Sequence, residues 1–156
     1  MQNFEKIIKL FIDNDVDFVL IGGLAATLHG SSIATQDIDF CVSFAEENCE
    51  KILKAIDGIN PIHRDIKKPF KENSQSLSKY KNLYLITDLG SIDMLGLVSG
   101  LGDYKKLISQ SIEVDLFNRK CKVLSIDALI KTKKEMQREK DKETIFQLEA
   151  IKEKTG

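Results

Sequence analysis

Residues 18–40 read FVLIGGLAATLHGSSIATQDIDF, and the order of residue types in this stretch decides the fold. An apolar run typical of a buried strand ends at Gly22–Gly23. The short apolar segment 24–30 follows and predicts a helix that ends at a glycine cap. Residues 37–44 alternate and are rich in β-branched and aromatic side chains, so they predict a second strand. The stretch therefore predicts a strand, a glycine turn, a short helix and another strand in close succession.

Two aspartates open the second of these strands. Asp37 and Asp39 are two residues apart, so their side chains project from the same face of a strand. Their carboxylates repel each other unless a cation lies between them, and Mg²⁺ binds one or two carboxylates together with substrate phosphate oxygens. The backbone N–H groups of Gly22–Gly23 can approach such a phosphate closely. The pattern predicts a metal-dependent phosphoryl or nucleotidyl transferase site.

A third carboxylate belongs to the same hypothesis. Asp93 lies in the apolar segment GSIDMLG, where an ionised side chain is costly unless it is paired, solvated or bound to metal. Each feature also has an ordinary structural explanation. The Asp37 and Asp39 pair can line the wet face of an edge strand, the two glycines can form only a tight turn, and Asp93 can face solvent from a hairpin. The residue pattern alone leaves both interpretations open.

Length and composition exclude several classes of protein. The chain has 156 residues, of which 42% are hydrophobic and 30% charged, as in a globular protein with one core. The net charge of -1 excludes a uniformly basic nucleic-acid-binding surface. Three scattered cysteines and two distant histidines argue against a disulfide framework or a zinc site, and favour the cytoplasm. No apolar stretch is long enough for a membrane span, so we expect no membrane association.

The rest of the chain predicts an α+β (mixed α/β) domain with a small central mixed sheet flanked by helices. We expect one domain over residues 1–156, with an α/β core at 1–124 and C-terminal helices at 125–154 that Ser125 caps. Residues 60–81 lack periodicity and predict an irregular surface excursion. The other expected elements are helices at 3–15 and 45–58, a strand pair at 83–98, a loop and short helix at 99–111, and a hairpin at 112–124 turning at Asn118–Arg119.

These residues resemble a known family, the minimal nucleotidyltransferase superfamily with the DNA polymerase β-like fold. The matching positions are Gly22–Gly23, Ala25, His29–Gly30, Thr35, Asp37–Ile38–Asp39 and Asp93, and in the helical tail Lys131, Arg138, Lys140 and Asp141. The chain is similar to small stand-alone prokaryotic members of the abortive-infection-toxin type. The resemblance implies a nucleotidyltransferase fold with a helical tail. It implies two-metal catalysis with Mg²⁺ (or Mn²⁺) bound by the catalytic residues Asp37, Asp39 and Asp93, and nucleotide contacts from Gly22, Gly23, Thr35 and Lys131.

The activity that the resemblance implies is transfer of a nucleoside monophosphate from an NTP, such as ATP, to an RNA, protein or small-molecule acceptor. The protein would then act as an enzyme or as a component of a toxin–antitoxin pair with a cognate partner. The alternative is a catalytically inactive nucleotidyltransferase-like protein that acts by protein–protein interaction. Ile33 supports this alternative, because relatives often carry a basic residue just before the threonine. His29 equally suits a packed, hydrogen-bonded role, and Lys131 equally suits a solvated helix face.

Overall fold

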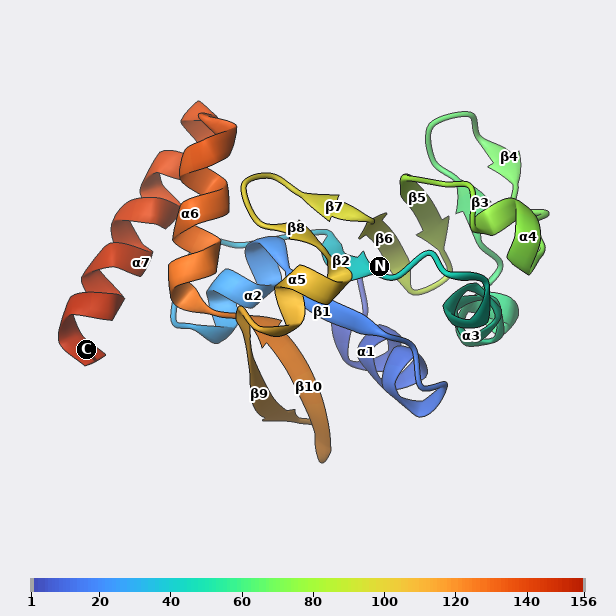
Figure 1. The fold of residues 1–156 in the computed structure, drawn as a ribbon, viewed down its shortest axis with the longest axis horizontal. Coiled ribbons are helices and arrows are strands. Elements are labelled where there is room, and N and C mark those ends of the chain that lie inside the picture. The colour runs from blue at the N-terminus through green and yellow to red at the C-terminus, as the bar shows by residue number, and fades with distance from the viewer. Residues whose placement is uncertain (1, 156) are drawn as a thin grey trace.

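A mixed sheet of eight strands crosses the molecule in the computed structural model, which describes residues 2–155 (Figure 1). The strand order is β4-β3-β5-β6-β2-β1-β10-β9. The neighbours β1 and β10 are parallel, as are β2 and β6, whereas the other pairs are antiparallel. The strands are β1 (Phe18–Ile21), β2 (Ile38–Val42), β3 (Ile62–His63), β4 (Lys68–Pro69), β5 (Asn82–Thr87), β6 (Gly90–Leu95), β9 (Ser111–Leu116) and β10 (Arg119–Leu124). A separate antiparallel ladder joins β7 (Leu97–Val98) and β8 (Gly102–Asp103).

Helices flank the sheet, which confirms the expected mixed α/β fold. Two of them, α6 and α7, lie side by side at one end of the molecule (Figure 1). The α-helices are α1 (Phe4–Asp13), α2 (Gly22–Leu28), α3 (Glu46–Ile56), α4 (Ser74–Leu77), α5 (Tyr104–Ile108), α6 (Ile126–Met136) and α7 (Lys142–Thr155), with short 3₁₀ turns at Asp57–Ile59 and Glu139–Asp141. No helix in the described part of the chain is long and apolar enough to cross a membrane.

Local chemistry explains where the C-terminal helices begin and end. Ser125 caps α6 as predicted, because its side chain accepts a hydrogen bond from the backbone N–H of Ala128 at 3.2 Å. The helix ends at Gln137, whose φ of +52° is left-handed and cannot continue an α-helix. The tail is therefore two helices, and the break between them places residues 138–141 beside the sheet.

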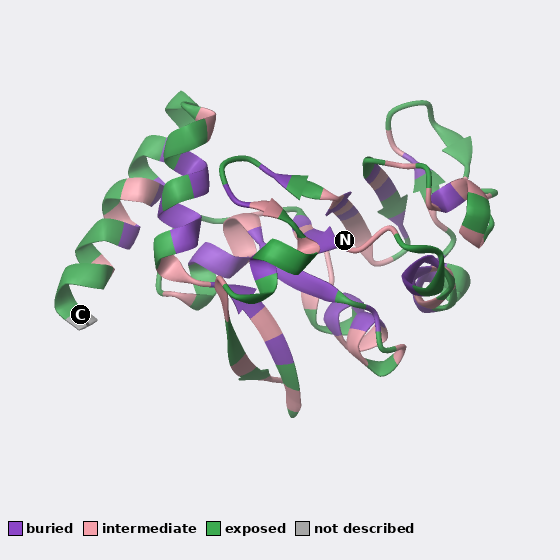
Figure 2. Cartoon of the chain, viewed as in Figure 1, coloured by how far each residue is buried: buried purple, intermediate pink, exposed green. Residues whose placement is uncertain are grey.

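The core lies between the sheet and α1. Phe11 from α1 packs against Phe18 and Phe40, with ring centroids 5.9 and 4.6 Å away. All four residues of β1 are buried, and Figure 2 shows that buried residues concentrate in the central strands, whereas α7 is largely exposed. Because side chains alternate along a strand, the face of β2 opposite Phe40 presents Asp39. The apolar face of the sheet thus fixes which way the acidic face points.

Two sequence-based expectations about local structure are wrong. Residues 60–81 are not irregular, because β3, β4 and α4 lie within them; Ile62 and His63 pair with Ile86 and Leu85 of β5. Strands of two residues are too short to show a period in the sequence. The second hairpin turns at Phe117–Asn118 rather than at Asn118–Arg119, since both residues have positive φ, as a two-residue hairpin turn of type I′ requires.

Candidate active site

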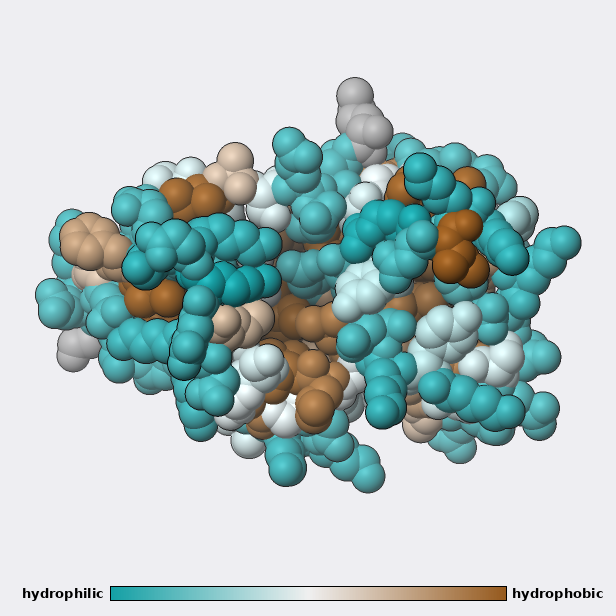
Figure 3. Space-filling model, turned by 90° about the horizontal axis from the view of Figure 1, so that it is seen from above, coloured by the Kyte–Doolittle hydropathy of each residue, from teal (hydrophilic) through white to brown (hydrophobic). Residues whose placement is uncertain are grey.

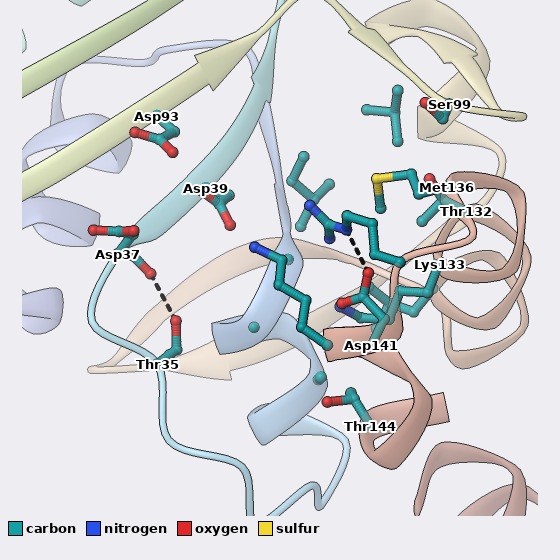
Figure 4. Close-up of a pocket in the computed structure, with 18 of the residues that line it drawn as sticks. Thr35, Asp37, Asp39, Asp93, Ser99, Thr132, Lys133, Met136, Asp141 and Thr144 are labelled. Carbon is teal, nitrogen blue, oxygen red and sulfur yellow. Dashed lines mark hydrogen bonds and ion pairs between the residues drawn. The ribbon is translucent and has the colours of Figure 1, made fainter. Parts of the chain in front are cut away.

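Two aspartates meet because β2 and β6 are parallel neighbours. Asp39 lies directly opposite Asp93 in the register of this strand pair, so both side chains leave the same face of the sheet. Asp37 lies just before β2 and faces the same pocket (Figure 4). Thr35 supports this segment, because its hydroxyl donates a hydrogen bond to the backbone carbonyl of Asp37 at 3.1 Å. The three predicted carboxylates therefore line one pocket.

The glycine turn packs against these carboxylates without any intervening side chain. Gly22 has a φ of +73°, and a Cβ atom at this position would lie 2.1 Å from Oδ2 of Asp39. A Cβ atom on Gly23 would lie 2.8 Å from the Thr35 hydroxyl oxygen. Only glycine allows the backbone to approach the Asp39 carboxylate and the Thr35 segment this closely. The predicted strand–turn–helix is present, and α2 begins at Gly22 itself.

The charges of the aspartate pair are poorly matched. Burial, together with the neighbouring carboxylates of Asp93 and Asp37, raises the pKa of Asp39 to about 7, although Lys133 opposes this change. Burial also raises the pKa of Asp93, against the opposing effect of Arg64. Oδ1 of Asp93 is buried, and Nη2 of Arg64 lies 2.8 Å from it. A carboxylate pair with surplus negative charge suits a hard divalent cation such as Mg²⁺ or Mn²⁺.

The carboxylates are not arranged as a ready-made cage. Across residues 2–155, no three His, Cys, Asp or Glu side chains are grouped as a metal-binding set. Mg²⁺ does not require such a cage, because it keeps several water ligands and takes others from substrate phosphates. Asp39 and Asp93 thus fit as protein ligands, and Asp37 fits as a further ligand supplied from the flanking loop.

A basic cluster faces the carboxylates from the C-terminal helices. Lys133 on α6 is buried, and its ammonium group pairs with Asp141 at 3.2 Å. Arg138 also pairs with Asp141, with its Nε 2.5 Å from Oδ2. Both cations line the same pocket as Asp39. The site therefore has an acidic wall on the sheet and a basic wall on the helical tail (Figure 4).

The structure does not bring Lys131 to this pocket. Lys131 is exposed and lines a different hollow, between α6 and α7. Lys133 faces the pocket instead. It lies at helical spacing between Leu129 and Met136, which line the same pocket from the same side of α6. A lysine on the apolar stripe of an amphipathic helix was the sequence signal that distinguishes Lys133 from Lys131.

The pocket between the two walls has a volume of about 450 Å³. Figure 3 shows the molecule hollowed on this side, with hydrophobic residues in the hollow. Its apolar lining includes Ile33, Leu95, Leu97, Val98 and Met136. A volume of this size, part apolar with a few convergent polar groups, is typical of small-molecule and nucleotide sites.

Two other residues named from the sequence have clear positions. His29 is not part of the pocket lining; its Nε2 lies 2.8 Å from the backbone carbonyl oxygen of Leu124, which ties α2 to β10. His29 therefore has the packed, hydrogen-bonded role. Ile33 does line the pocket, in the loop before Thr35, and its side chain is exposed.

Arg64 is a further residue of this region, and no pattern in the sequence indicates it. It follows β3, within the segment expected to be irregular, and its Nη2 lies 2.8 Å from Oδ1 of Asp93. Nothing in the local pattern IHRD marks this arginine, because its partner is reached only through the pairing of β3, β5 and β6.

Comparisons with known proteins support the fold. No protein-family model matches the chain, and no curated protein matches it by sequence. A candidate nucleotidyltransferase of Thermotoga maritima matches in structure with a TM-score of 0.59 and 18% identity, over 94% of each chain. The lincosamide antibiotic adenylyltransferase LnuA, solved with lincomycin bound, matches with a TM-score of 0.65 and 17% identity, over 96% of this chain and 98% of its own. The chain therefore has the nucleotidyltransferase fold.

Proposed function

We propose that the protein uses this fold to transfer a nucleoside monophosphate from an NTP, such as ATP, to the hydroxyl group of an acceptor. We further propose that Asp37, Asp39 and Asp93 hold Mg²⁺ or Mn²⁺ for this reaction, and that residues 1–156 act as one domain. The observation that carries the proposal is the Asp39–Asp93 pair packed directly against Gly22. A mixed sheet with carboxylates beside a glycine turn supports phosphate chemistry.

Each wall of the pocket has a role in this reaction. Bound divalent cations supply charge stabilisation to the phosphate oxygens of the NTP. The absence of side chains on Gly22 and Gly23 lets Asp39 and Thr35 pack against this turn, and Thr35 holds the Asp37 backbone in place. The backbone N–H groups of the turn are the proposed contact to the triphosphate. Lys133 provides a buried positive charge on the opposite wall and replaces Lys131 as the proposed phosphate contact.

Asp93 is the proposed proton acceptor. Burial raises the pKa of Asp93, which makes its carboxylate a stronger base for the proton of an acceptor hydroxyl. The acceptor oxygen then bonds to the α-phosphorus, the bond from that phosphorus to the β-phosphate oxygen breaks, and pyrophosphate leaves. The proton of the hydroxyl ends on the Asp93 carboxylate.

The lining of the pocket favours a small-molecule acceptor. Leu95, Leu97 and Val98 lie on the Asp93 side of the pocket and present an apolar surface beside the proposed proton acceptor. A small molecule with a hydroxyl group and an apolar body fits this surface. The structural likeness to an adenylyltransferase named for lincosamide antibiotics supports the same choice. RNA and protein acceptors are the other outcomes of the test below.

The alternative function is that of an inactive protein acting through a cognate toxin or antitoxin partner. The Arg64 contact with Asp93 favours it, because it occupies a carboxylate that catalysis needs. Ile33 no longer favours it, because Lys133, Arg138 and Lys140 already bring positive charge to the pocket that Ile33 lines. The pocket therefore contains positive charge even though position 33 carries no basic residue.

The test is incubation with each α-³²P-labelled NTP and Mg²⁺ or Mn²⁺, together with separate small-molecule, RNA and protein fractions of a cell extract. We expect label in the small-molecule fraction, lost in Asp39→Asn and retained in the surface control Asp115→Asn. Label in RNA or protein instead supports a toxin-type activity of the same site. Unchanged NTP in every reaction, with or without Asp39, contradicts the proposal.

A further inference from the structure

Arg64 places a fixed positive charge on the third carboxylate. The ion pair to Asp93 joins two side chains that are 30% and 17% exposed, so water screens it only in part. Nη2 lies 2.8 Å from Oδ1, within the range of a charge-assisted hydrogen bond. The guanidinium opposes the effect of burial on the pKa of Asp93, as a nearby cation does.

Two contacts besides the ion pair hold Arg64 in this position. The backbone N–H of Arg64 donates to the carbonyl oxygen of Tyr84 at 3.0 Å, which aligns the end of β3 with β5. The guanidinium carbon lies 5.3 Å from the centroid of the Tyr84 ring. Tyr84 itself lies opposite Asp93 in the register of β5 and β6. The neighbouring His63 is buried, with its ring 6.0 Å from that of Tyr80 and stacked on it.

The charge of the site is then suited to a single divalent cation. Asp37, Asp39 and Asp93 together carry three negative charges when ionised, and Arg64 matches one of them. One Mg²⁺ or Mn²⁺ matches the remaining two. Lys133 and Arg138, which share Asp141 as their partner, lie on the opposite wall, where Lys133 is the proposed phosphate contact. A second divalent cation at Asp93 would have to displace the guanidinium or lie beside it, and like charges at such a distance repel.

We infer that Arg64 takes the place of a second metal ion at Asp93, so that the site works with one divalent cation. The cation bound by Asp37 and Asp39 serves the NTP phosphates, and the guanidinium is the positive charge next to the acceptor. This inference rests on the proposed function. In this interpretation Arg64 positions Asp93 for the reaction and does not inhibit the site.

The test counts Mn²⁺ ions bound per chain, from the electron paramagnetic resonance signal of free Mn²⁺ during titration of the nucleotide-free protein. We expect one Mn²⁺ per chain in the wild type and two in R64Q, because the variant leaves Asp93 unmatched. R64K keeps the positive charge and should bind one. R119Q is the matched control, because Arg119 is also 30% exposed and pairs with Asp13 at 2.6 Å, far from the pocket; it should bind one.

Two Mn²⁺ ions in the wild type, or one in R64Q, overturn the inference while leaving the proposed function intact. No Mn²⁺ in any of the four nucleotide-free proteins overturns the inference alone, because the proposed cation also takes ligands from the NTP phosphates; label transfer from the NTP decides the proposed function. R64M, which keeps the aliphatic stem over Tyr84, replaces R64Q if thermal unfolding shows that R64Q does not fold, and the same counts then decide.

Discussion

At the scale of single residues, Gly22 is the position where we expect an added side chain to be most disruptive. Gly22→Ala would place a methyl group against the Asp39 carboxylate, at a φ of +73°. We expect unfolding in urea to show a loss of about 1–3 kcal/mol from backbone strain and displacement of the carboxylate. Calorimetric titration should show MgATP binding weakened about tenfold or more. Gly58→Ala is the control, because no atom lies within 4 Å of its Cβ position. Equal effects at the two positions would contradict the proposed approach of backbone to carboxylate.

Asp39 should make the metal-free protein less stable as the pH rises. Its pKa is about 7 in the folded chain and near its ordinary value of 3.8 in the unfolded chain. Between these values the folded state holds a proton that the unfolded state has released, so stability falls as the pH rises from 3.8 to 7. The asparagine side chain of Asp39→Asn does not titrate in this range, so the variant lacks this pH-dependent contribution to stability. In urea unfolding with EDTA, we expect the stability of Asp39→Asn relative to wild type to increase by roughly 1–3 kcal/mol from pH 5 to pH 8. A constant difference would contradict the raised pKa of Asp39 in the folded chain.

At the scale of elements, the buried ion pair between α6 and the turn before α7 is the main polar contact of the helical tail. Burial opposes the ionisation of Asp141, but Arg138 and Lys133 outweigh it and hold the pKa of Asp141 below its ordinary value. Asp141→Asn leaves Lys133 buried without a counter-charge, so we expect a loss of about 3–5 kcal/mol in urea unfolding at pH 7. In the wild type this contribution is present above pH 3.8 and is lost as the pH falls through the lowered pKa.

The control for this prediction is Asp115→Asn. Asp115 pairs with Lys120 at 2.7 Å, but both side chains are about 70% exposed. We expect a change of no more than about 1 kcal/mol, because water screens exposed pairs. A similar loss in the two variants would mean that burial of Lys133 carries no special cost.

The elements that the sequence predicted well are those with a strong local signal. The glycine turn, α6 with its Ser125 cap and the strands around Asp88–Gly90 each follow from propensity and period. The two-residue strands β3 and β4 have no such signal, since they exist only through pairing with β5. The resemblance points to Lys131, but a match to a sequence pattern does not fix which face of a helix points to the pocket, and the structure places Lys133 there.

At the scale of the whole molecule, the site depends on long-range pairing. The pair Asp37 and Asp39 is local and was predicted, and Asp93 was predicted from its cost in an apolar strand. The contact between Asp39 and Asp93 requires the parallel pairing of β2 with β6, and that of Arg64 requires two further pairings. No sequence spacing encodes such contacts, so the Arg64 contact could come only from the structure.

The central claim is that the carboxylate face binds an NTP through a divalent cation. Isothermal titration of each NTP into the wild type, with Mg²⁺ and with EDTA, tests it most directly. We predict binding only with Mg²⁺, loss of binding in Asp37→Ala and Asp39→Ala, and unchanged binding in Asp115→Asn. Binding that persists in EDTA or in Asp39→Ala, or no binding of any NTP to the wild type, would contradict the claim.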